Sequence, residues 1–207
     1  MRESDEIPSS MVTVPSGPIA AGSPDRDLAS GAMLGDYRIE HKIGRGSSGD
    51  VYRAQHVATG TRAAIKILRG DNDPEAVQRF IAEARVIQDI GNSNIVDVLS
   101  FGTAPDGRAY LVMEWLPGET LRQRLKLGPL DVETACRIAR QLVRALGAAH
   151  GKRIVHRDVK PDNVFLVAGE PLTVKLLDFG MTKLLKTDRM TQTASGAFVG
   201  TPMYVAP

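Results

Sequence analysis

The glycine-rich segment Gly44-Arg45-Gly46-Ser47-Ser48-Gly49 constrains the fold of this chain more than any other feature. In dinucleotide-binding folds this G-x-G-x-x-G pattern opens a helix, and an acidic residue follows about 20 positions later. Here the residues after Gly49 continue as a strand, and the corresponding later region offers Lys66. A glycine turn between two strands lets backbone N–H groups approach phosphates closely, because glycine has no Cβ atom. The segment therefore predicts a phosphate-binding loop between neighbouring strands.

The first half of the chain predicts a small sheet with one helix. The turn Ala58-Thr59-Gly60 joins two strands into a hairpin. Apolar residues at helical spacing then follow Asp73-Pro74, an N-cap with a first-turn proline, and stop at Gly91. Two further strands flank the turn Ala104-Pro105-Asp106-Gly107. The predicted strands are 50–56, 61–68, 95–101 and 108–114.

The second half is predicted to be mainly helical. Asp131 can cap a helix that ends at Gly151. Two short strands, 164–167 and 174–177, follow this helix. The apolar positions of the helix are Ala135, Ile138, Ala139, Leu142, Leu146 and Ala149.

Composition limits the compartment and the class of partner. Residues 1–35 are rich in Ser, Pro, Gly and Ala, which predicts a disordered leader. The net charge is +2, and the basic residues are too widely spread along the chain to indicate nucleic-acid binding. The single cysteine, Cys136, excludes an internal disulfide and suits a reducing compartment. No apolar run has the length of a membrane span, so we expect a cytoplasmic protein with no membrane segment in this chain.

Lys66 interrupts the otherwise apolar strand Ala63-Ala64-Ile65-Lys66-Ile67-Leu68. An edge strand whose lysine reaches water would also account for this position. Glu83, however, follows Phe80 by three residues and precedes Ile87 by four, so its carboxylate shares the apolar face of the predicted helix. An unpaired buried charge is very costly. We therefore predict that Glu83 pairs with Lys66 and directs the ammonium group towards bound phosphates.

The polar segment His156-Arg157-Asp158-Val159-Lys160-Pro161-Asp162-Asn163 is followed, after the next apolar strand, by Asp178-Phe179-Gly180. Phosphoryl transfer requires oxygen ligands for Mg²⁺, a carboxylate near the attacking hydroxyl and a cation for the developing charge. A salt-bridged surface turn would explain either motif alone, but not both at this spacing. We predict Asn163 and Asp178 as metal ligands, Asp158 for the hydroxyl and Lys160 for the transferred phosphate.

In their order and spacing, these motifs make residues 37–207 similar to the eukaryotic-like protein Ser/Thr kinases of bacterial type. The resemblance implies an α+β, two-lobed kinase fold over residues 36–207. The N-lobe, about 36–116, would hold a small antiparallel sheet and one major helix, and the C-lobe, about 117–207, would be mainly helical and incomplete. It also implies ATP and Mg²⁺ as cofactors, with Mn²⁺ as the alternative ion, and proteins with Ser or Thr acceptors as substrates.

The resemblance also assigns roles to individual residues. Lys66, Glu83, Asp158 and Lys160 would be the catalytic residues. Met113 would guard the back of the nucleotide pocket, and the backbone of Glu114 and Leu116 would read the adenine edge. The remaining ATP-binding positions would be Ile43, Gly44, Gly46, Gly49, Val51, Ala64 and Phe165.

Regulation and substrate choice are implied by the same resemblance. Lys160, two residues after Asp158, is the Ser/Thr-specific pattern, and Thr201 lies in a segment that resembles the substrate loop. Arg157 beside Asp158 implies control by activation-loop phosphorylation, because a phosphate there can pair with an arginine. Thr191 and Thr193 are the predicted phosphosites. Self-association for autophosphorylation is a further expectation.

The chain departs from the family pattern at three places. Asn92-Ser93-Asn94 replaces a commoner His-Pro-Asn, and Ser48 occupies the loop tip where a bulkier residue is frequent. The sequence ends at Pro207, one residue before an expected glutamate and the helices that would form the floor of the C-lobe. Two alternatives to a protein kinase stay open, and the early end of the sequence bears only on the second. One is a small-molecule phosphotransferase, and the other is an inactive nucleotide-binding fragment or pseudokinase that serves as an interaction module.

Overall fold

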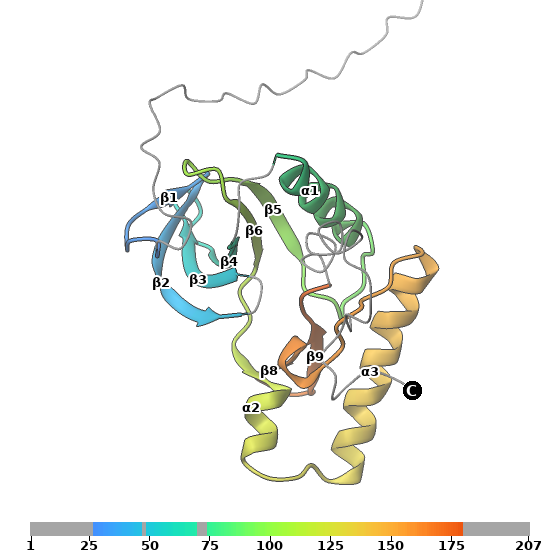
Figure 1. Cartoon of the computed structure of the whole chain (residues 1–207). Helices are drawn as coiled ribbons and strands as arrows, with labels where there is room; N and C mark the ends of the chain where they lie inside the picture. Colours follow the sequence, from blue (N-terminus) through green and yellow to red (C-terminus); the bar gives the residue numbers. More distant parts are fainter. Residues whose placement is uncertain (1–26, 47–48, 70–73, 180–207) are drawn as a thin grey trace, which may run out of the picture.

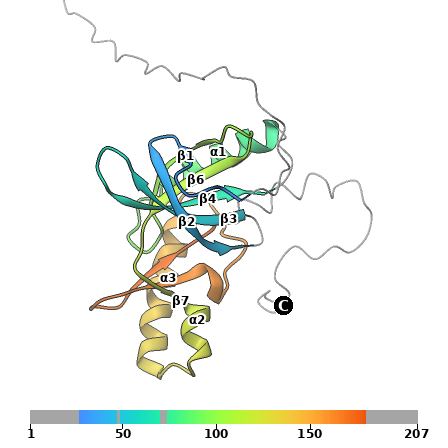
Figure 2. The same ribbon diagram turned by 90° about the vertical axis from the view of Figure 1, so that its left-hand side faces the viewer.

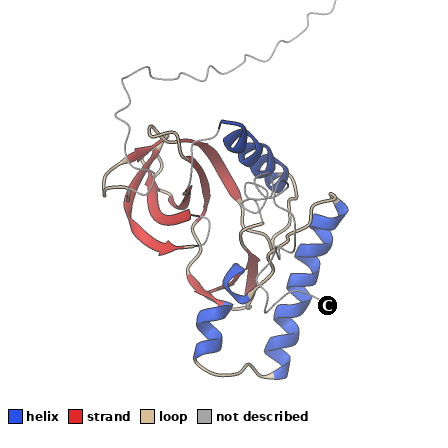
Figure 3. Ribbon diagram, in the orientation of Figure 1, coloured by secondary structure: helices blue, strands red, loops and turns tan. Residues whose placement is uncertain are grey.

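The computed structural model describes residues 27–46, 49–69 and 74–179, and within the first helix it leaves out the side chains of residues 74–76, 79 and 83. A curled six-stranded sheet with helix α1 forms one lobe, and a three-stranded sheet with helices α2 and α3 forms the other (Figure 1). Figure 3 shows that strands dominate the first lobe, whereas α2 and α3 belong to the second. The predicted α+β, two-lobed fold is confirmed.

The larger sheet is antiparallel throughout, in the order β1-β2-β3-β4-β6-β5. The hairpin predicted across Ala58-Thr59-Gly60 is confirmed as β3 and β4, with Val51 opposite Lys66. The strands are β1 (Met33–Leu34), β2 (Tyr37–Arg45), β3 (Gly49–His56), β4 (Arg62–Leu68), β5 (Val98–Thr103) and β6 (Ala109–Glu114), and the helix is α1 (Pro74–Gln88).

The two faces of this sheet are buried in two different apolar clusters, because successive side chains of a strand point to opposite faces. One cluster contains Tyr52, Ile65 and Val112 and fills the inside of the curl. The other contains Leu111 and Met113 and continues into α1 through Phe80, Ala84 and Ile87. Helix α1 therefore covers the second face, beside β5 and β6 (Figure 1).

The second lobe begins with a strand that crosses to a new sheet. β7 (Gly118–Thr120) pairs with β8 (Val164–Val167), which pairs with β9 (Thr173–Leu176). Between them run α2 (Leu121–Lys126), α3 (Val132–Gly151) and the short 3-10 helix η1 (Pro161–Asn163). Seen after a 90° turn, α2 and α3 lie at the end of the molecule opposite β1 (Figure 2). The predicted N-cap of α3 is confirmed, since the Thr134 N–H donates to Asp131 Oδ1 at 2.8 Å.

Residues 92–96 connect the lobes behind the sheet. The buried Asn94 side chain donates to Gln141 Oε1 of α3 and to the Val174 carbonyl of β9, both at 2.9 Å. The Leu176 N–H donates to the Asn94 carbonyl at 2.8 Å, and Ile95 bridges in parallel to Leu176. Asn94, the one position at which this segment keeps the residue of the commoner His-Pro-Asn, therefore holds α3 and β9 against the first lobe.

Two expectations need correction. The predicted leader extends to residue 35, but Met33–Leu34 form β1 and Leu34 is 2% exposed, so the end of that segment is part of the sheet. The apolar pattern of residues 27–35 is too short to predict this, and pairing with β2 supplies the burial. In α3, Ala135 and Ala139 are exposed, whereas Ala145 is fully buried beside Ile138 and Ala149. The buried apolar face of α3 is therefore narrower than the alanine positions predict.

Candidate active site

The glycine-rich loop is the connection between β2 and β3. Gly44 lies opposite Val51, Arg45 lies opposite Asp50, and the Gly46 N–H donates to the Gly49 carbonyl at 2.8 Å. Residues 47–48 are outside the described part of the chain. A Cβ atom on Gly49 would lie 2.2 Å from the Ile67 carbonyl oxygen, whereas one on Gly44 would meet nothing within 4 Å. Glycine at position 49 is therefore required by the close approach of β3 to β4.

Lys66 lies on β4 and is 4% exposed. Its Nζ meets Asp178 Oδ2 at 2.7 Å, so the buried ammonium has a carboxylate partner from the other lobe. The predicted partner, Glu83, lies within α1, but its side chain is outside the described residues, and that pairing stays a prediction. Because Asp178 was expected only as a metal ligand, its ion pair with Lys66 is a contact that sequence reasoning missed.

The catalytic segment is held in place by a buried histidine. His156 is 1% exposed, its Nε2 donates to the Leu177 carbonyl at 2.8 Å, and its Nδ1 accepts the Asp158 N–H at 3.2 Å. Its ring also packs against that of Phe179, with centroids 4.7 Å apart. One side chain thus joins the segment that carries Asp158 to the segment that carries Asp178. No role was predicted for His156 from the sequence, because its partners Leu177 and Phe179 are distant along the chain.

Asp158, Lys160 and Asn163 form the centre of this segment. Asp158 Oδ2 meets Lys160 Nζ at 2.9 Å, and Asn163 Nδ2 donates to Asp158 Oδ2 at 3.1 Å and to its carbonyl at 2.8 Å. The Asp158 side chain is 15% exposed. The Leu177 N–H donates to the Asn163 carbonyl at 2.8 Å, so Asn163 is also fixed next to Asp178 along the backbone.

Two residues of the site have left-handed backbone conformations, Arg157 with φ of 62° and Asp178 with φ of 49°. Such conformations are costly for residues other than glycine, and they persist where surrounding contacts over-determine the backbone. His156 bonds to Asp158 on the far side of Arg157, and it contacts Leu177 and Phe179 on the two sides of Asp178. The backbone of both segments is thus held in the geometry that presents Asp158 and Asp178.

The predicted adenine-binding residues come from both lobes. Met113 is buried opposite Ala64 across β4 and β6, and Val51, Leu116 and Phe165 are half-buried, whereas Ile43 is 44% exposed. The Glu114 N–H donates to the Asp97 carbonyl at 3.0 Å, so of the Glu114 peptide only the carbonyl can serve an adenine edge. The Glu114 carboxylate meets Lys175 Nζ at 2.5 Å and accepts the Asp97 N–H at 2.9 Å. This side chain therefore joins the segment between the lobes to β9.

The regulatory and substrate-loop predictions fall on different parts of the chain. Arg157 is exposed next to Asp158. Thr191, Thr193 and Thr201 lie outside the described residues. Of the predicted phosphorylation control, the structure describes only Arg157, and the two phosphosites stay predictions.

A glycine loop and a buried lysine in one lobe, facing a histidine-supported Asp158, Lys160 and Asn163 in the other, define the catalytic core of a kinase-like fold. The family model described as "Protein kinase domain" matches residues 37–207. The serine/threonine-protein kinase Pkn1 of Myxococcus xanthus is 44% identical over 186 residues, which are 88% of this chain and 26% of Pkn1. The chain belongs to the protein kinase domain family.

Two further similarities agree with this assignment. The serine/threonine-protein kinase PknA of Mycobacterium tuberculosis is 39% identical over 183 residues, 84% of this chain and 41% of PknA. The crystal structure of the Mycobacterium tuberculosis PknI kinase domain matches with a TM-score of 0.66 at 30% identity, over 75% of this chain and 64% of that one. The chain spans about a quarter of Pkn1 and about two fifths of PknA.

Protein kinases use ATP and a divalent metal ion, and two side-chain oxygens here fit the metal ion. Both amide hydrogens of Asn163 are donated to Asp158, which leaves its Oδ1 for a cation within the described part of the chain. Asp178 offers a second carboxylate oxygen beside the one that meets Lys66. Amide and carboxylate oxygens are the ligands that hard divalent cations prefer.

Proposed function

We propose that this protein is a Ser/Thr protein kinase that transfers the γ-phosphoryl group of Mg-ATP to Ser or Thr hydroxyls of protein substrates. The observation that carries the proposal is a pair of linked ion-paired groups, one of which spans the two lobes. Lys66 with Asp178 forms one, Asp158 with Lys160 and Asn163 forms the other, and His156 connects them. Phosphoryl transfer depends mainly on positioning and on charge stabilisation, which these pairs supply.

Each residue has a distinct task in this proposal. ATP bound with the metal ion supplies the phosphoryl group, whose bond to the leaving phosphate oxygen breaks as a bond to the hydroxyl oxygen forms. Asp158 orients the acceptor hydroxyl and takes its proton, and Asn163 fixes the Asp158 carboxylate. Lys160 lies close enough to Asp158 to meet negative charge at the acceptor. Lys66, oriented by Asp178, holds phosphate oxygens.

The finer assignments are part of the same proposal. Mg²⁺ is the ion that we assign to Asn163 and Asp178, since phosphate-bound Mg²⁺ needs few protein ligands. Phosphorylation of Thr191 and Thr193, by a second copy of the chain, would order the loop near the exposed Arg157. Metal specificity is measured by titrating Mg²⁺ and Mn²⁺ into the chelated enzyme, and the phosphosites by mass spectrometry of the protein after incubation with ATP.

We also propose a cytoplasmic location, which suits the single, exposed thiol of Cys136. Among the described residues, no helix has the length and apolar character needed to cross a bilayer. Cell fractionation of the full-length protein tests the location, and recovery in the membrane fraction would overturn it.

The proposed activity is tested with γ-labelled ATP, Mg²⁺ and a basic protein acceptor, using the wild type and Asp158→Asn. The variant keeps the shape of the side chain but removes its charge. We expect label on Ser and Thr of the acceptor, and a decrease of about 10²–10⁴-fold in the variant. Equal labelling by both proteins would refute the assignment of Asp158. Label on a small metabolite alone would indicate a small-molecule phosphotransferase, and nucleotide binding without transfer would indicate a pseudokinase.

A further inference from the structure

A buried carboxylate lies directly behind the glycine-rich loop. Asp50, the residue after Gly49, is 1% exposed although it is charged. Alternation along β3 places Asp50 on the same face as the buried Tyr52, and Val51 on the opposite face, where it lies among the predicted adenine-binding residues. Asp50 therefore acts from behind the loop and does not face the nucleotide.

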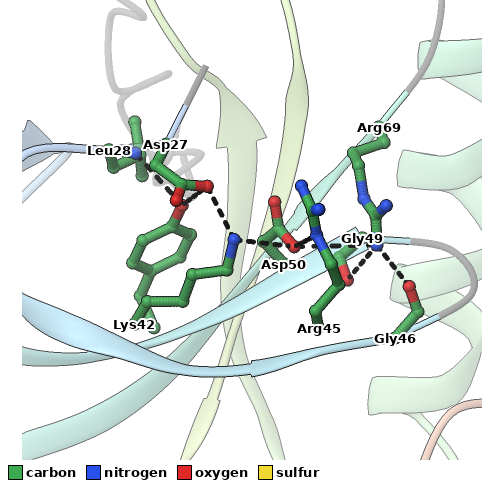
Figure 4. Close-up of polar contacts among 9 residues, drawn as sticks. Asp27, Leu28, Lys42, Arg45, Gly46, Gly49, Asp50 and Arg69 are labelled. Atoms are coloured by element: carbon green, nitrogen blue, oxygen red, sulfur yellow. Dashed lines mark hydrogen bonds and ion pairs between the residues drawn. The ribbon is translucent and has the colours of Figure 1, made fainter. Parts of the chain in front are cut away.

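Three cations from separate places in the chain converge on Asp50 Oδ1 (Figure 4). Lys42 Nζ and Arg45 Nε, both of β2, lie at 3.1 Å, and Arg69 Nη2, just after β4, lies at 3.6 Å. Burial alone would raise the pKa of Asp50, but the hydrogen bonds from Arg45 and Lys42 and the charge of Arg69 hold it below its ordinary value. The carboxylate stays ionised at neutral pH, and its negative charge reduces the repulsion among the three cations.

Arg69 carries the effect of Asp50 into the loop itself. Its Nη2 donates to the Gly46 carbonyl and, at 3.4 Å, to the Gly49 carbonyl (Figure 4). These carbonyls lie on either side of residues 47–48, and the Gly46 N–H donates across to the Gly49 carbonyl. A single guanidinium, held by Asp50, thus fastens both ends of the loop tip to the end of β4, three residues after Lys66.

The outer end of the same network does not touch the loop. Lys42 Nζ also meets Asp27 Oδ1 at 2.6 Å, and the Asp27 side chain is 61% exposed. The Tyr52 hydroxyl lies 3.4 Å from the same oxygen and accepts the Leu28 N–H at 3.0 Å. Asp27 thus shares Lys42 with Asp50, and the pKa of Asp27 is lowered mainly by Lys42 and only slightly by the charge of Arg45.

We propose that Asp50 is a positioning residue for nucleotide binding, which sets the height of the glycine-rich loop over the phosphates through Arg69 and Arg45. The proposal rests on the proposed function, since it takes the loop as the phosphate cover. An ordinary cross-strand ion pair would stabilise the β2–β3 hairpin and affect only the unfolding temperature. A positioning role instead predicts a change in the KM for ATP that exceeds the change in kcat, because the loop contacts nucleotide and not the protein acceptor.

The test compares Asp50→Asn with Asp27→Asn and Glu40→Gln in full-length protein. Glu40 pairs with Arg53 across the same two strands at 2.5 Å, so its variant removes a β2–β3 ion pair away from the loop. For each protein we would measure Tm, the Kd of a fluorescent ATP analogue, and the KM for ATP and kcat. For Asp50→Asn we expect a rise of about tenfold in Kd and in KM, with kcat changed less than threefold. Both controls should keep the wild-type KM.

Arg69→Gln provides the second variant, because it removes the guanidinium that donates to the Gly46 and Gly49 carbonyls and leaves Asp50 paired with Lys42 and Arg45. It should raise the KM for ATP as Asp50→Asn does, and it decides the matter alone if Asp50→Asn does not fold. Unchanged KM and Kd in a folded Asp50→Asn or in Arg69→Gln would overturn the proposal, as would an equal rise in Glu40→Gln. A wild type that binds no nucleotide would instead refute the proposed function.

Discussion

Replacing Gly49 with alanine tests whether the close contact between β3 and β4 sets the shape of the phosphate loop. The added Cβ would lie 2.2 Å from the Ile67 carbonyl oxygen, 3.0 Å from its carbon and 3.3 Å from Leu68 Cα. All three atoms belong to the backbone of β4, and no side-chain rotation can move them. The contact is about 1.2 Å shorter than the 3.4 Å at which ordinary van der Waals contact begins, so the strands must separate.

The cost of this separation follows from the location of the contact. Overpacking of a well-packed region by one methyl group costs about 1–3 kcal/mol. For a domain of this size, about 2 kcal/mol lowers Tm by about 4–8 °C. The Gly49 carbonyl would also move away from its donors, the Gly46 N–H and the Arg69 guanidinium, so ATP binding should weaken together with stability.

Gly44→Ala is the matched control in the same loop. Its Cβ would meet no atom within 4 Å, and an alanine that fits its backbone conformation reduces the entropy of the unfolded chain. We expect an unchanged or slightly higher Tm for Gly44→Ala and the decrease above for Gly49→Ala, both measured by thermal unfolding followed by circular dichroism. Equal Tm values for the two variants would refute the argument from the β3–β4 contact.

Three further predictions concern other parts of the site. Lys66→Met should decrease phosphoryl transfer at least about 100-fold, as measured with labelled ATP. The protein should stay folded, as measured by Tm, because the Asp178 side chain is 34% exposed and can be hydrated when its partner is lost. A normal transfer rate would contradict the role of the ion pair. Asn94→Ala should lower the free energy of unfolding, measured in urea, by about 1–3 kcal/mol, because Gln141 and the Val174 carbonyl lose a buried donor. Ser93 is exposed, so Ser93→Ala should not change this free energy. Equal stability of the two variants would show that Asn94 does not join α3 to β9. The folded-state pKa of Asp50 lies below its ordinary value of 3.8, so the stability that it adds is present above that pH and is lost as pH falls through the lower, folded value. The difference in unfolding free energy between wild type and Asp50→Asn should therefore be constant from about pH 6 to 8 and begin to shrink only as pH falls below about 4. A difference that stays constant in more acidic solution would exclude the carboxylate charge as its source.

Several features of the site could be predicted because they depend on residues that are close in sequence. The β3–β4 hairpin, the N-cap at Asp131 and the burial of Lys66 follow from strand alternation, capping chemistry and an apolar context. The side-chain contacts among Asp158, Lys160 and Asn163 are likewise local, across at most five residues, although His156 also ties this loop to Leu177. Local patterns of this kind are readable from the chain alone.

Other features escaped the sequence because their partners are distant along the chain. Nothing near Met33–Leu34 indicates a strand, since its burial comes from pairing with β2. Asp50 has the pattern of an ordinary polar strand residue, yet it is 1% exposed and pairs with Arg69 beyond the next strand as well as with Lys42 and Arg45. Asn94 acquires its role only when α3 and β9 pack against it.

The sequence by itself therefore determined the chemical inventory of this protein, namely the glycine loop, the buried lysine and the charged segments in the order of a protein kinase. Tertiary structure decided which of these groups are paired and which of three similar glycines cannot be replaced. Asp178 meets Lys66 across the two lobes, and Gly49 alone of the loop glycines is pressed against β4. The physical reason is that composition and periodicity specify which face of an element is buried, whereas distances between charged groups depend on how separate elements pack together.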